Sequence, residues 1–409
     1  MRFCILVSAL CLLISPAVAG WFPLNPGTTT DLDAVWFPVD TATGFAVGGG
    51  GLVLKTTNGG TTWESLPGSR IGWLTDVQFP LDARTGYAVA SGGRIYKTTD
   101  GGATWVRESS SVTLDLRSIC FPTSAETGYV SGGDAGNGVI LKTTNGGLQW
   151  VGKALGLSSP VTSVCFPVST LVGYAVGWQG LIVKTTDGGA TWATQNSHTT
   201  ADLACVLFPE DEAIGYIAGS GGTVLKTTDG GDGWFAETTG VSNYLASVSF
   251  PTGNDVGYAA GDAGTVIKTT DGGHHWARQD TATSAFLSGV QFPSDARTGY
   301  AVGRNGTIIK TTDGGSWIAE GGEPAVNRQE PGASIVRGVL SLPRDMSGLP
   351  GNSDRIPGPT LLDISGRKVL ALHPGANSVR GLAPGVYFVR WPAGREPGAA
   401  TVGRVTVLR

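Results

Sequence analysis

Short apolar segments separated by glycine-rich polar turns occupy most of the chain. In one example, Leu74–Pro80 is an apolar run that ends at a proline, and two more runs follow at Gly86–Val89 and Arg94–Thr98. A turn at Asp100–Gly102 then leads to a fourth run that begins at Trp105. Runs of this length, separated by Gly and Asp turns, indicate a four-stranded antiparallel meander.

This unit recurs seven times along the chain. The segment Lys-Thr-Thr-Asp/Asn-Gly-Gly begins at Lys55, Lys97, Lys142, Lys184, Lys226, Lys268 and Lys310. Neighbouring copies are 42 residues apart, except for the second and third, which are 45 apart. Four strands of about six residues with their turns fill such a period. A unit of this kind buries its apolar surface by stacking on copies of itself, so the pattern predicts an all-β repeat fold.

Each repeat contains a turn with an Asp or Asn, two Gly and a Trp. The side-chain oxygen of Asp or Asn accepts N–H bonds within the turn, and the Gly pair provides positive φ angles. We interpret these residues as structural, because one carboxylate per turn falls far short of the roughly six to eight oxygen ligands of calcium. The turn residues are Asn58, Asp100, Asn145, Asp187, Asp229, Asp271 and Asp313, and each Trp is predicted to fold over its turn: Trp63, Trp105, Trp150, Trp192, Trp234, Trp276 and Trp317.

The segment Thr98–Trp105 resembles the Asp-box, or BNR repeat, of β-propellers. With the preceding Gly-Tyr-Ala-Val-Gly, the repeats are similar to the photosystem II assembly and stability factor family, and the likeness covers about residues 21–318. The resemblance implies a seven-bladed β-propeller over residues 20–318. Trp21–Leu24 resembles the fourth run of a repeat and is predicted to pair with the last repeat, which would close the ring. Trp317–Ile318 is the alternative closing segment.

Both ends of the chain differ from the repeats. Arg2, an apolar run and Ala17–Ala19 are typical of a signal peptide, predicted at residues 1–19. No later apolar run is long enough to span a membrane. A linker rich in Gly, Pro and charge is predicted at 319–334, and 335–409 is predicted to form a small β-sandwich. Its expected strands are Ile335–Leu342, Thr360–Ile364, Lys368–Leu372, Val386–Trp391 and Val402–Leu408.

Three segments of the C-terminal part resemble the sorting domains of type IX secretion, also called Por domains. They are Leu362–Val369, Leu382–Arg390 and the ending Arg404–Arg409. The resemblance implies that the secretion machinery is a partner of this domain. Together with the signal peptide, it implies export through the periplasm to the outer cell surface or the medium.

Composition and charge exclude several classes of function. The formal net charge is −4 and charged residues make up 15% of the chain, so the basic surface that binds nucleic acid is not expected. Cys120, Cys165 and Cys205 remain after the signal peptide, and we interpret them as small buried hydrophobes, with a disulfide as the alternative. Since no zinc or nucleophile motif occurs, we expect no metal or cofactor. The repeated Lys are predicted to lie along a neighbouring blade, against a Trp face; a ring of positive charge is the alternative.

Binding residues are expected where the repeats differ from one another. Trp178 and Gln179, and likewise Arg304 and Asn305, occupy a turn that elsewhere contains mostly Gly, Ser or Ala. Aromatic residues precede the first strand at positions that hold Asp31, Asp115 and Asp202 in other repeats; they are Trp73, Tyr244 and Phe286. Aromatic residues with an Arg are typical of binding hot spots. The alternative is that these aromatic residues cover the core or a loop.

The function that this pattern favours is non-enzymatic binding of a protein or a glycan at the cell surface or outside it. Asp-boxes also occur in sialidases, so a sialidase-like glycoside hydrolase is one alternative. Such an enzyme needs clustered Arg, a Tyr with a Glu partner and an acidic group, which the repeats do not supply in any regular position. A photosystem II assembly factor-like chaperone of a membrane complex is the other alternative.

Overall fold

The computed structural model describes 20–66, 72–251 and 253–315, and in the C-terminal part 334–336, 339–342, 360–362, 367–371, 375–378, 385–390 and 402–407. The chain divides into two units, Met1–Pro324 and Ala325–Arg409. The predicted signal peptide, Trp317 and nearly all of the predicted linker lie outside the described residues.

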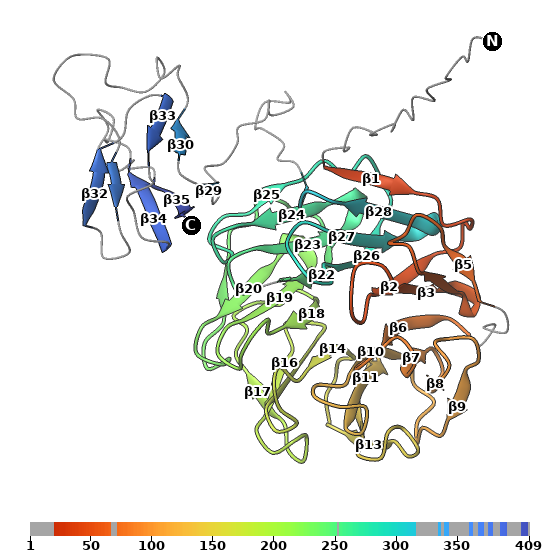
Figure 1. Ribbon diagram of the computed structural model, residues 1–409. Coiled ribbons are helices and arrows are strands. Elements are labelled where there is room, and N and C mark those ends of the chain that lie inside the picture. The colour runs from red at the N-terminus through yellow and green to blue at the C-terminus, as the bar shows by residue number, and fades with distance from the viewer. Residues whose placement is uncertain are drawn as a thin grey trace, which may run out of the picture. The chain divides into compact units, whose positions relative to one another are not determined.

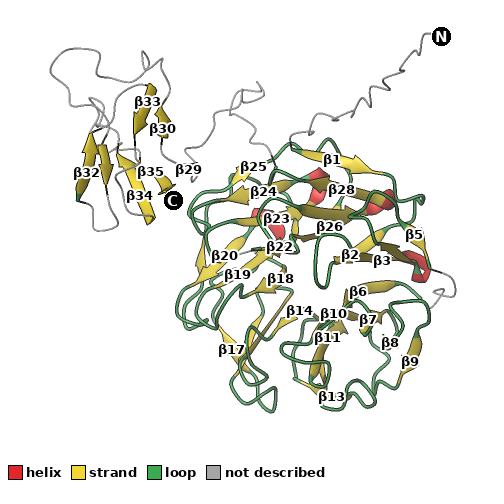
Figure 2. Cartoon of the chain, in the orientation of Figure 1, coloured by secondary structure: helices red, strands yellow, loops and turns green. Residues whose placement is uncertain are grey.

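The first unit is a seven-bladed β-propeller, which confirms the predicted fold class (Figure 1). Each blade is a four-stranded antiparallel sheet whose first strand lies innermost, and short loops connect the strands (Figure 2). Blades 1 to 4 comprise β2 (Leu32–Trp36), β3 (Gly44–Gly48), β4 (Val53–Thr56), β5 (Glu64–Ser65); β6 (Leu74–Gln78), β7 (Gly86–Ala90), β8 (Arg94–Thr98), β9 (Val106–Glu108); β10 (Leu116–Cys120), β11 (Gly128–Asp134), β12 (Asn137–Thr143), β13 (Val151–Ala154); and β14 (Val161–Cys165), β15 (Gly173–Gly177), β16 (Ile182–Thr185), β17 (Ala193–Gln195). Blades 5 to 7 comprise β18 (Leu203–Leu207), β19 (Gly215–Gly219), β20 (Val224–Thr227), β21 (Phe235–Ala236); β22 (Leu245–Ser249), β23 (Gly257–Gly261), β24 (Val266–Thr269), β25 (Ala277–Arg278); and β26 (Leu287–Gln291), β27 (Gly299–Gly303), β28 (Thr307–Thr311), β1 (Trp21–Leu24).

The N-terminal strand closes the ring. β1 pairs antiparallel with β28, from Trp21 opposite Thr311 to Leu24 opposite Ile308, and supplies the fourth strand of blade 7. This agrees with the predicted role of Trp21–Leu24. Closure joins the first and last repeats, so no blade is left with a missing strand.

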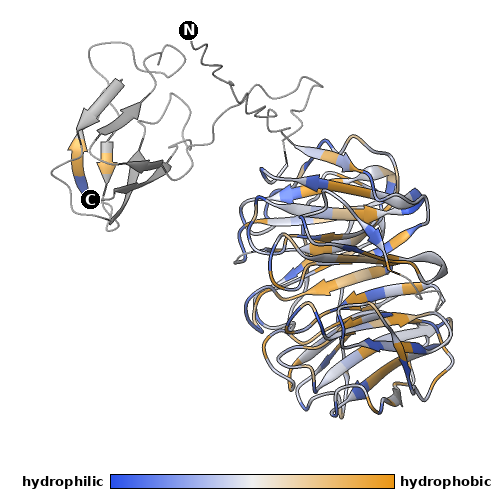
Figure 3. Cartoon of the chain, turned by 45° about the vertical axis from the view of Figure 1, so that its right-hand side comes forward, coloured by the Kyte–Doolittle hydropathy of each residue, from blue (hydrophilic) through white to orange (hydrophobic). Residues whose placement is uncertain are grey.

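Aromatic side chains fill the space between neighbouring blades. Between blades 3 and 4, the rings of Tyr129 and Phe166 stack with centroids 3.6 Å apart, and Trp192 meets Phe166 edge-on at 6.0 Å. Gly173 faces this cluster, where a Cβ would lie 2.4 Å from the Phe166 ring, so only glycine fits. In blade 7 the edge-on partner of the phenylalanine is Trp21. In Figure 3, orange hydrophobic segments occur on strands throughout the ring, with white and blue segments between them.

Hydrogen bonds from side chains within each repeated turn stabilise that turn. In the second repeat, Thr98 Oγ1 donates to Asp100 Oδ1 at 2.8 Å, and the Thr104 backbone N–H donates to the same oxygen at 2.9 Å. Asn58 accepts the corresponding N–H bond at 2.9 Å, which explains why Asp and Asn alternate at this position. The Thr104 hydroxyl also donates to Asp100 Oδ2 at 2.6 Å, and this bond, together with those from the Thr104 backbone and Thr98, holds the pKa of Asp100 down, at about 2.

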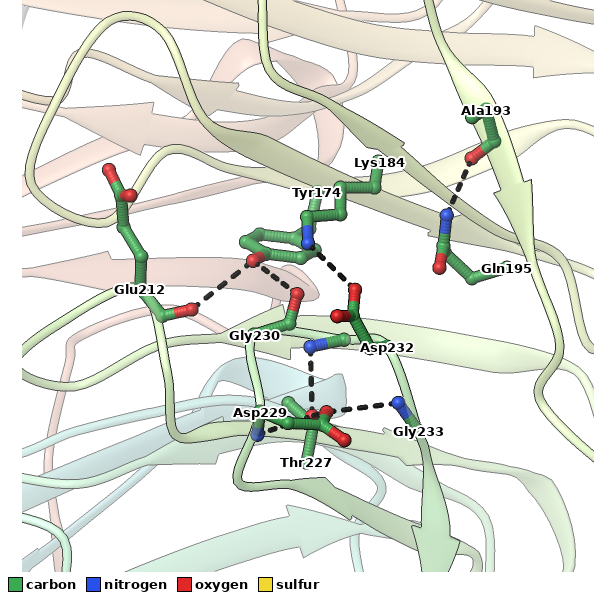
Figure 4. A network of polar contacts seen from close by, with 11 residues as sticks. Tyr174, Lys184, Ala193, Gln195, Glu212, Thr227, Asp229, Gly230, Asp232 and Gly233 are labelled. Atoms are coloured by element: carbon green, nitrogen blue, oxygen red, sulfur yellow. Dashed lines mark hydrogen bonds and ion pairs between the residues drawn. The ribbon is translucent and has the colours of Figure 1, made fainter.

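Polar side chains form hydrogen bonds between each blade and the next. In Figure 4, the hydroxyl of Tyr174 lies 2.7 Å from the Gly230 carbonyl and 3.2 Å from that of Glu212, both in the following blade. At most junctions a Lys also donates to the turn carbonyl, but Lys184 pairs instead with Asp232 at 3.3 Å. The predicted contact with a Trp face is wrong. The ammonium groups lie over the Tyr or Phe ring of their own blade, because both side chains reach across the same junction.

In the part of the second unit that the structure describes, seven short strands form two sheets. They are β29 (Ser334–Val336), β30 (Val339–Leu342), β31 (Thr360–Leu362), β32 (Lys368–Ala371), β33 (Gly375–Ser378), β34 (Gly385–Arg390) and β35 (Val402–Val407). Five form one sheet in the order β29-β35-β34-β31-β32, and β30 pairs with β33. The single strand predicted at Ile335–Leu342 is therefore divided between two sheets. β33 was not predicted from the sequence, because Gly-Ala-Asn-Ser has low β-propensity.

None of the helical segments in the described parts of the chain is long and apolar enough to cross a membrane.

Candidate functional site

The seven predicted binding residues all lie on one face of the ring. Because the inner strand of a blade is antiparallel to the second strand, the start of one lies beside the end of the other, as in the pairing of Leu287 with Gly303. The turns after the second strands and the residues before the inner strands therefore share one edge, which we call the binding rim. It carries Trp73, Trp178, Gln179, Tyr244, Phe286, Arg304 and Asn305.

Aspartates fix the turns of the binding rim. Asp202 Oδ1 accepts the backbone N–H of Gln179 at 2.9 Å, and Asp31 Oδ1 accepts that of Asn305 at 2.8 Å. Gln179 and Asn305 both have positive φ angles, of 58° and 57°. Each bond joins an inner strand to the turn of the preceding blade, so the rim is held in one shape before any ligand arrives.

Four aromatic residues stand on this rim: Tyr244 and Phe286 form a pair, and Trp73 and Trp178 stand separately on other blades. Tyr244 and Phe286 stack with centroids 6.1 Å apart, and the Arg304 guanidinium lies 5.1 Å from the Phe286 ring. Trp73 is 46% exposed and Trp178 is 38% exposed, which leaves area for contact with a ligand. The arrangement combines exposed aromatic faces with a cation, the pair of features enriched at binding hot spots.

A carboxylate on the rim has an unusual acidity. The Trp73 indole N–H donates to Asp33 Oδ2 at 2.7 Å. Burial raises the pKa of Asp33 to about 6, although the Trp73 bond and the charge of Arg304 lower it. Asp33 therefore titrates near neutral pH and couples its charge to the position of Trp73.

The central channel opens at the rim and encloses a cavity of about 380 Å³. Small residues from the inner strands line most of it, including Thr162, Ser247 and Ser288. Asp76 also lines it, but its oxygens accept the backbone N–H groups of Val77 and Ile119 at 2.8 and 2.9 Å. This carboxylate is therefore occupied in joining blade 2 to blade 3.

Sequence reasoning missed one residue of the channel mouth. Arg117, the second residue of β10, places its guanidinium 5.7 Å from the centroid of the Trp178 ring. An alignment of the inner strands could have revealed it, because no other inner strand has a base at this position.

The three cysteines join neighbouring blades. Cys120 Sγ accepts the Phe166 backbone N–H at 3.4 Å, and all three thiols are free. Burial raises the pKa of Cys120 to about 12 and that of Cys165 further, so these thiols stay protonated. In the described ranges, no group of three or more His, Cys, Asp or Glu is arranged to hold a metal ion.

Comparisons with known proteins agree on the fold. The family described as photosynthesis system II assembly factor YCF48 matches residues 149–236 and 190–289. YCF48 from Cyanidioschyzon merolae is 21% identical with a TM-score of 0.59, over 72% of this chain and 98% of that one. A structure of YCF48 bound to D1 peptide is 20% identical with a TM-score of 0.57, over 73% and 99%.

A propeller of similar fold also occurs in an enzyme. The GH74 xyloglucanase from Xanthomonas campestris is 14% identical with a TM-score of 0.58, over 72% of this chain and 54% of that one. No curated protein matches the chain. At these identities the structures establish a shared architecture: the ring is a β-propeller similar to the photosystem II assembly factor YCF48.

Proposed function

We propose that this chain is an exported, non-enzymatic propeller that binds a segment of another protein across the binding rim. The observation that carries the proposal is the set of aromatic side chains and Arg304 held on turns that aspartates fix in place. The YCF48 structure with a bound D1 peptide supports it, since a ring of similar architecture accepts a peptide.

A protein ligand fits the rim better than a glycan. The Tyr244–Phe286 stack and the Arg304 guanidinium above it form a continuous apolar and cationic surface. Tyr, Trp and Arg are the residues that contribute most to protein–protein binding. A glycan would require several free hydrogen-bond donors and acceptors beside an aromatic face. The carboxylate of Asp33 instead accepts a bond from Trp73.

The engaged carboxylates also argue against the glycoside hydrolase alternative. Hydrolysis needs an acid and a second carboxylate that face a common sugar. Asp76 is held by backbone N–H groups, and Asp33 by Trp73. We expect no turnover of a panel of aryl glycosides by the full-length protein, whereas measurable release of the aryl group would favour the enzyme.

The proposed location rests on the two ends of the sequence. The signal-like segment at residues 1–19 and the Por-like motifs at 335–409 both favour export, with the secretion machinery as a partner of the C-terminal unit. N-terminal sequencing of the protein recovered from the medium or the cell surface tests this, and we expect the mature chain to begin near Gly20. Recovery of the whole chain in the cytoplasm would contradict it.

The binding proposal is tested with random dodecapeptides selected on the full-length protein. Affinities of the selected peptides are measured by calorimetry for the wild type, Trp178→Ala and Phe286→Ala. We expect each rim variant to bind about tenfold more weakly. Phe235→Ala is the matched control, because Phe235 is an exposed aromatic residue on an outer strand. Equal binding by the wild type and both rim variants would refute the proposal.

A further inference from the structure

Arg117 is the single base among seven equivalent positions around the channel. Each inner strand contributes its second residue to the lining of the cavity. The other six positions carry Asp33, Thr75, Thr162, Ala204, Ala246 and Ser288. The propeller repeat therefore does not require an arginine here, and small residues fill the same position in most blades.

The guanidinium of Arg117 lacks a carboxylate partner in the described part of the ring. The ion pairs found there are Lys184 with Asp232 and His275 with Asp271. Its Nε atom is buried and has no hydrogen-bond acceptor among the described residues. A buried donor without an acceptor costs free energy, and native proteins contain few of them. A ligand that supplies an acceptor would remove this cost.

The surroundings orient this cation toward the rim. The face of Trp178 lies against the guanidinium, at 5.7 Å, and limits its rotation. On the other side of the mouth, burial raises the pKa of Tyr244 and the charge of Arg117 opposes that rise. The charge of Arg117 therefore acts on Tyr244 as well as on Trp178, two residues of the binding rim.

We propose that Arg117 binds a carboxylate of a peptide that lies across the binding rim, with this group inserted into the channel mouth. The proposal rests on the peptide-binding function proposed above. The planar guanidinium presents paired N–H donors that match the two oxygens of a carboxylate, and removal from water strengthens such a pair. The cavity of about 380 Å³ has room for an acidic side chain or for a chain end.

A double-mutant cycle tests the pair. The probes are the dodecapeptides selected on the full-length protein, each resynthesised with one Asp or Glu changed to Asn or Gln, or with the C-terminal acid changed to an amide. Each probe is titrated into the wild type and into Arg117→Gln. We expect one neutralisation to weaken binding to the wild type about tenfold and to have little effect on Arg117→Gln. The position of the sensitive carboxylate in the peptide shows whether Arg117 binds an acidic side chain or the C-terminal carboxylate.

Two results would overturn the proposal. One is that every carboxylate of the probes can be neutralised without loss of affinity for the wild type. The other is that the effects of neutralisation and of Arg117→Gln simply add. If Arg117→Gln does not fold, Arg117→Lys replaces it in the same cycle, because it keeps the charge and loses the planar fork. If peptide affinity falls in Phe286→Ala but not in Arg117→Gln, only the present proposal is refuted. If peptide affinity is unchanged in every rim variant, the proposed function itself is refuted.

Discussion

The first blade lacks one hydroxyl that the other six blades use at their junctions. Phe45 stands where the other repeats have a Tyr, and it stacks on Phe79 with centroids 3.9 Å apart. Tyr87 shows what is missing, because its hydroxyl lies 3.1 Å from the Ala125 carbonyl and 3.0 Å from the Gly146 carbonyl. Phe45→Tyr would direct the same hydroxyl at the equivalent carbonyls of the second blade.

The carbonyls needed for this bond are already in place. Lys55 donates to the Gly101 carbonyl at 3.0 Å, and a Cβ on Gly101 would lie 2.9 Å from the Ala83 carbonyl, so the two acceptors are adjacent. Burial raises the pKa of Tyr87 to about 12, so a hydroxyl in this position stays protonated and donates. We expect Phe45→Tyr to raise the free energy of unfolding by about 1 kcal/mol, the net value of one such bond.

The reverse change supplies the matched control. Tyr87→Phe removes the donor from the Ala125 carbonyl, while the Gly146 carbonyl keeps its bond from Lys97 at 2.7 Å. The expected loss is about 1–2 kcal/mol, because one buried acceptor is left without a partner. The double variant should lie close to the sum of the two single changes, since the two sites belong to different junctions.

Guanidinium chloride unfolding of the full-length protein, followed by tryptophan fluorescence, measures these changes. All the tryptophans except Trp391 lie in the first unit, so the signal follows the ring. The midpoint should rise for Phe45→Tyr and fall for Tyr87→Phe, with the dependence on denaturant unchanged. A lower midpoint for Phe45→Tyr would refute the reasoning, since it would mean that the first junction has no room for the hydroxyl.

Three further predictions concern the turns, the core and the rim. The pKa of Asp100 is about 2 in the folded state against 3.8 for the free group, so the contribution of Asp100 to stability is present above pH 4 and is lost as the pH falls toward 2. Asp100→Asn should therefore make the free energy of unfolding less sensitive to acid. An unchanged dependence of unfolding on pH would contradict this prediction. Gly173→Ala should lower the free energy of unfolding by about 1–3 kcal/mol through overpacking. Gly289→Ala is the control and should have little effect, because the nearest atom to a Cβ there lies at 3.5 Å. Equal effects of the two substitutions in denaturation would refute the steric argument. The fluorescence of Trp73, measured as the difference between the wild type and Trp73→Phe, should titrate with a midpoint near pH 6, because the pKa of Asp33 is raised to about 6. The same difference measured in the Asp33→Asn background should not change with pH. A titration that persists in that background would assign the change to another group.

The repeat made the ring predictable from the sequence. Seven copies of one turn fix the number of blades, and Gly173 with Phe166 shows how each copy is constrained by packing against the next. The closing strand was predictable because Trp21 repeats a residue type that every blade needs beside its phenylalanine. These signals depend on local sequence and on repetition, which pattern analysis detects.

The channel mouth was harder to predict, because it depends on departures from the repeat. Arg117 has no local motif, and its meaning comes from Trp178, which belongs to the next blade. The raised pKa of Asp33 likewise comes from burial and from a bond to Trp73, 40 positions away along the chain. Contacts of this kind follow from how blades are placed around the axis, which the sequence of one repeat does not specify.

The register of β1 determines how the ring responds to mechanical force. Trp21 lies opposite Thr311, so the first and last strands of the propeller segment have their outer ends at the same end of one antiparallel strand pair. Tension between those ends loads the backbone bonds of this pair one after another, as in a zipper, rather than all at once. The seventh blade, which closes the ring, is therefore the first to unfold when a pulling force acts on either terminus.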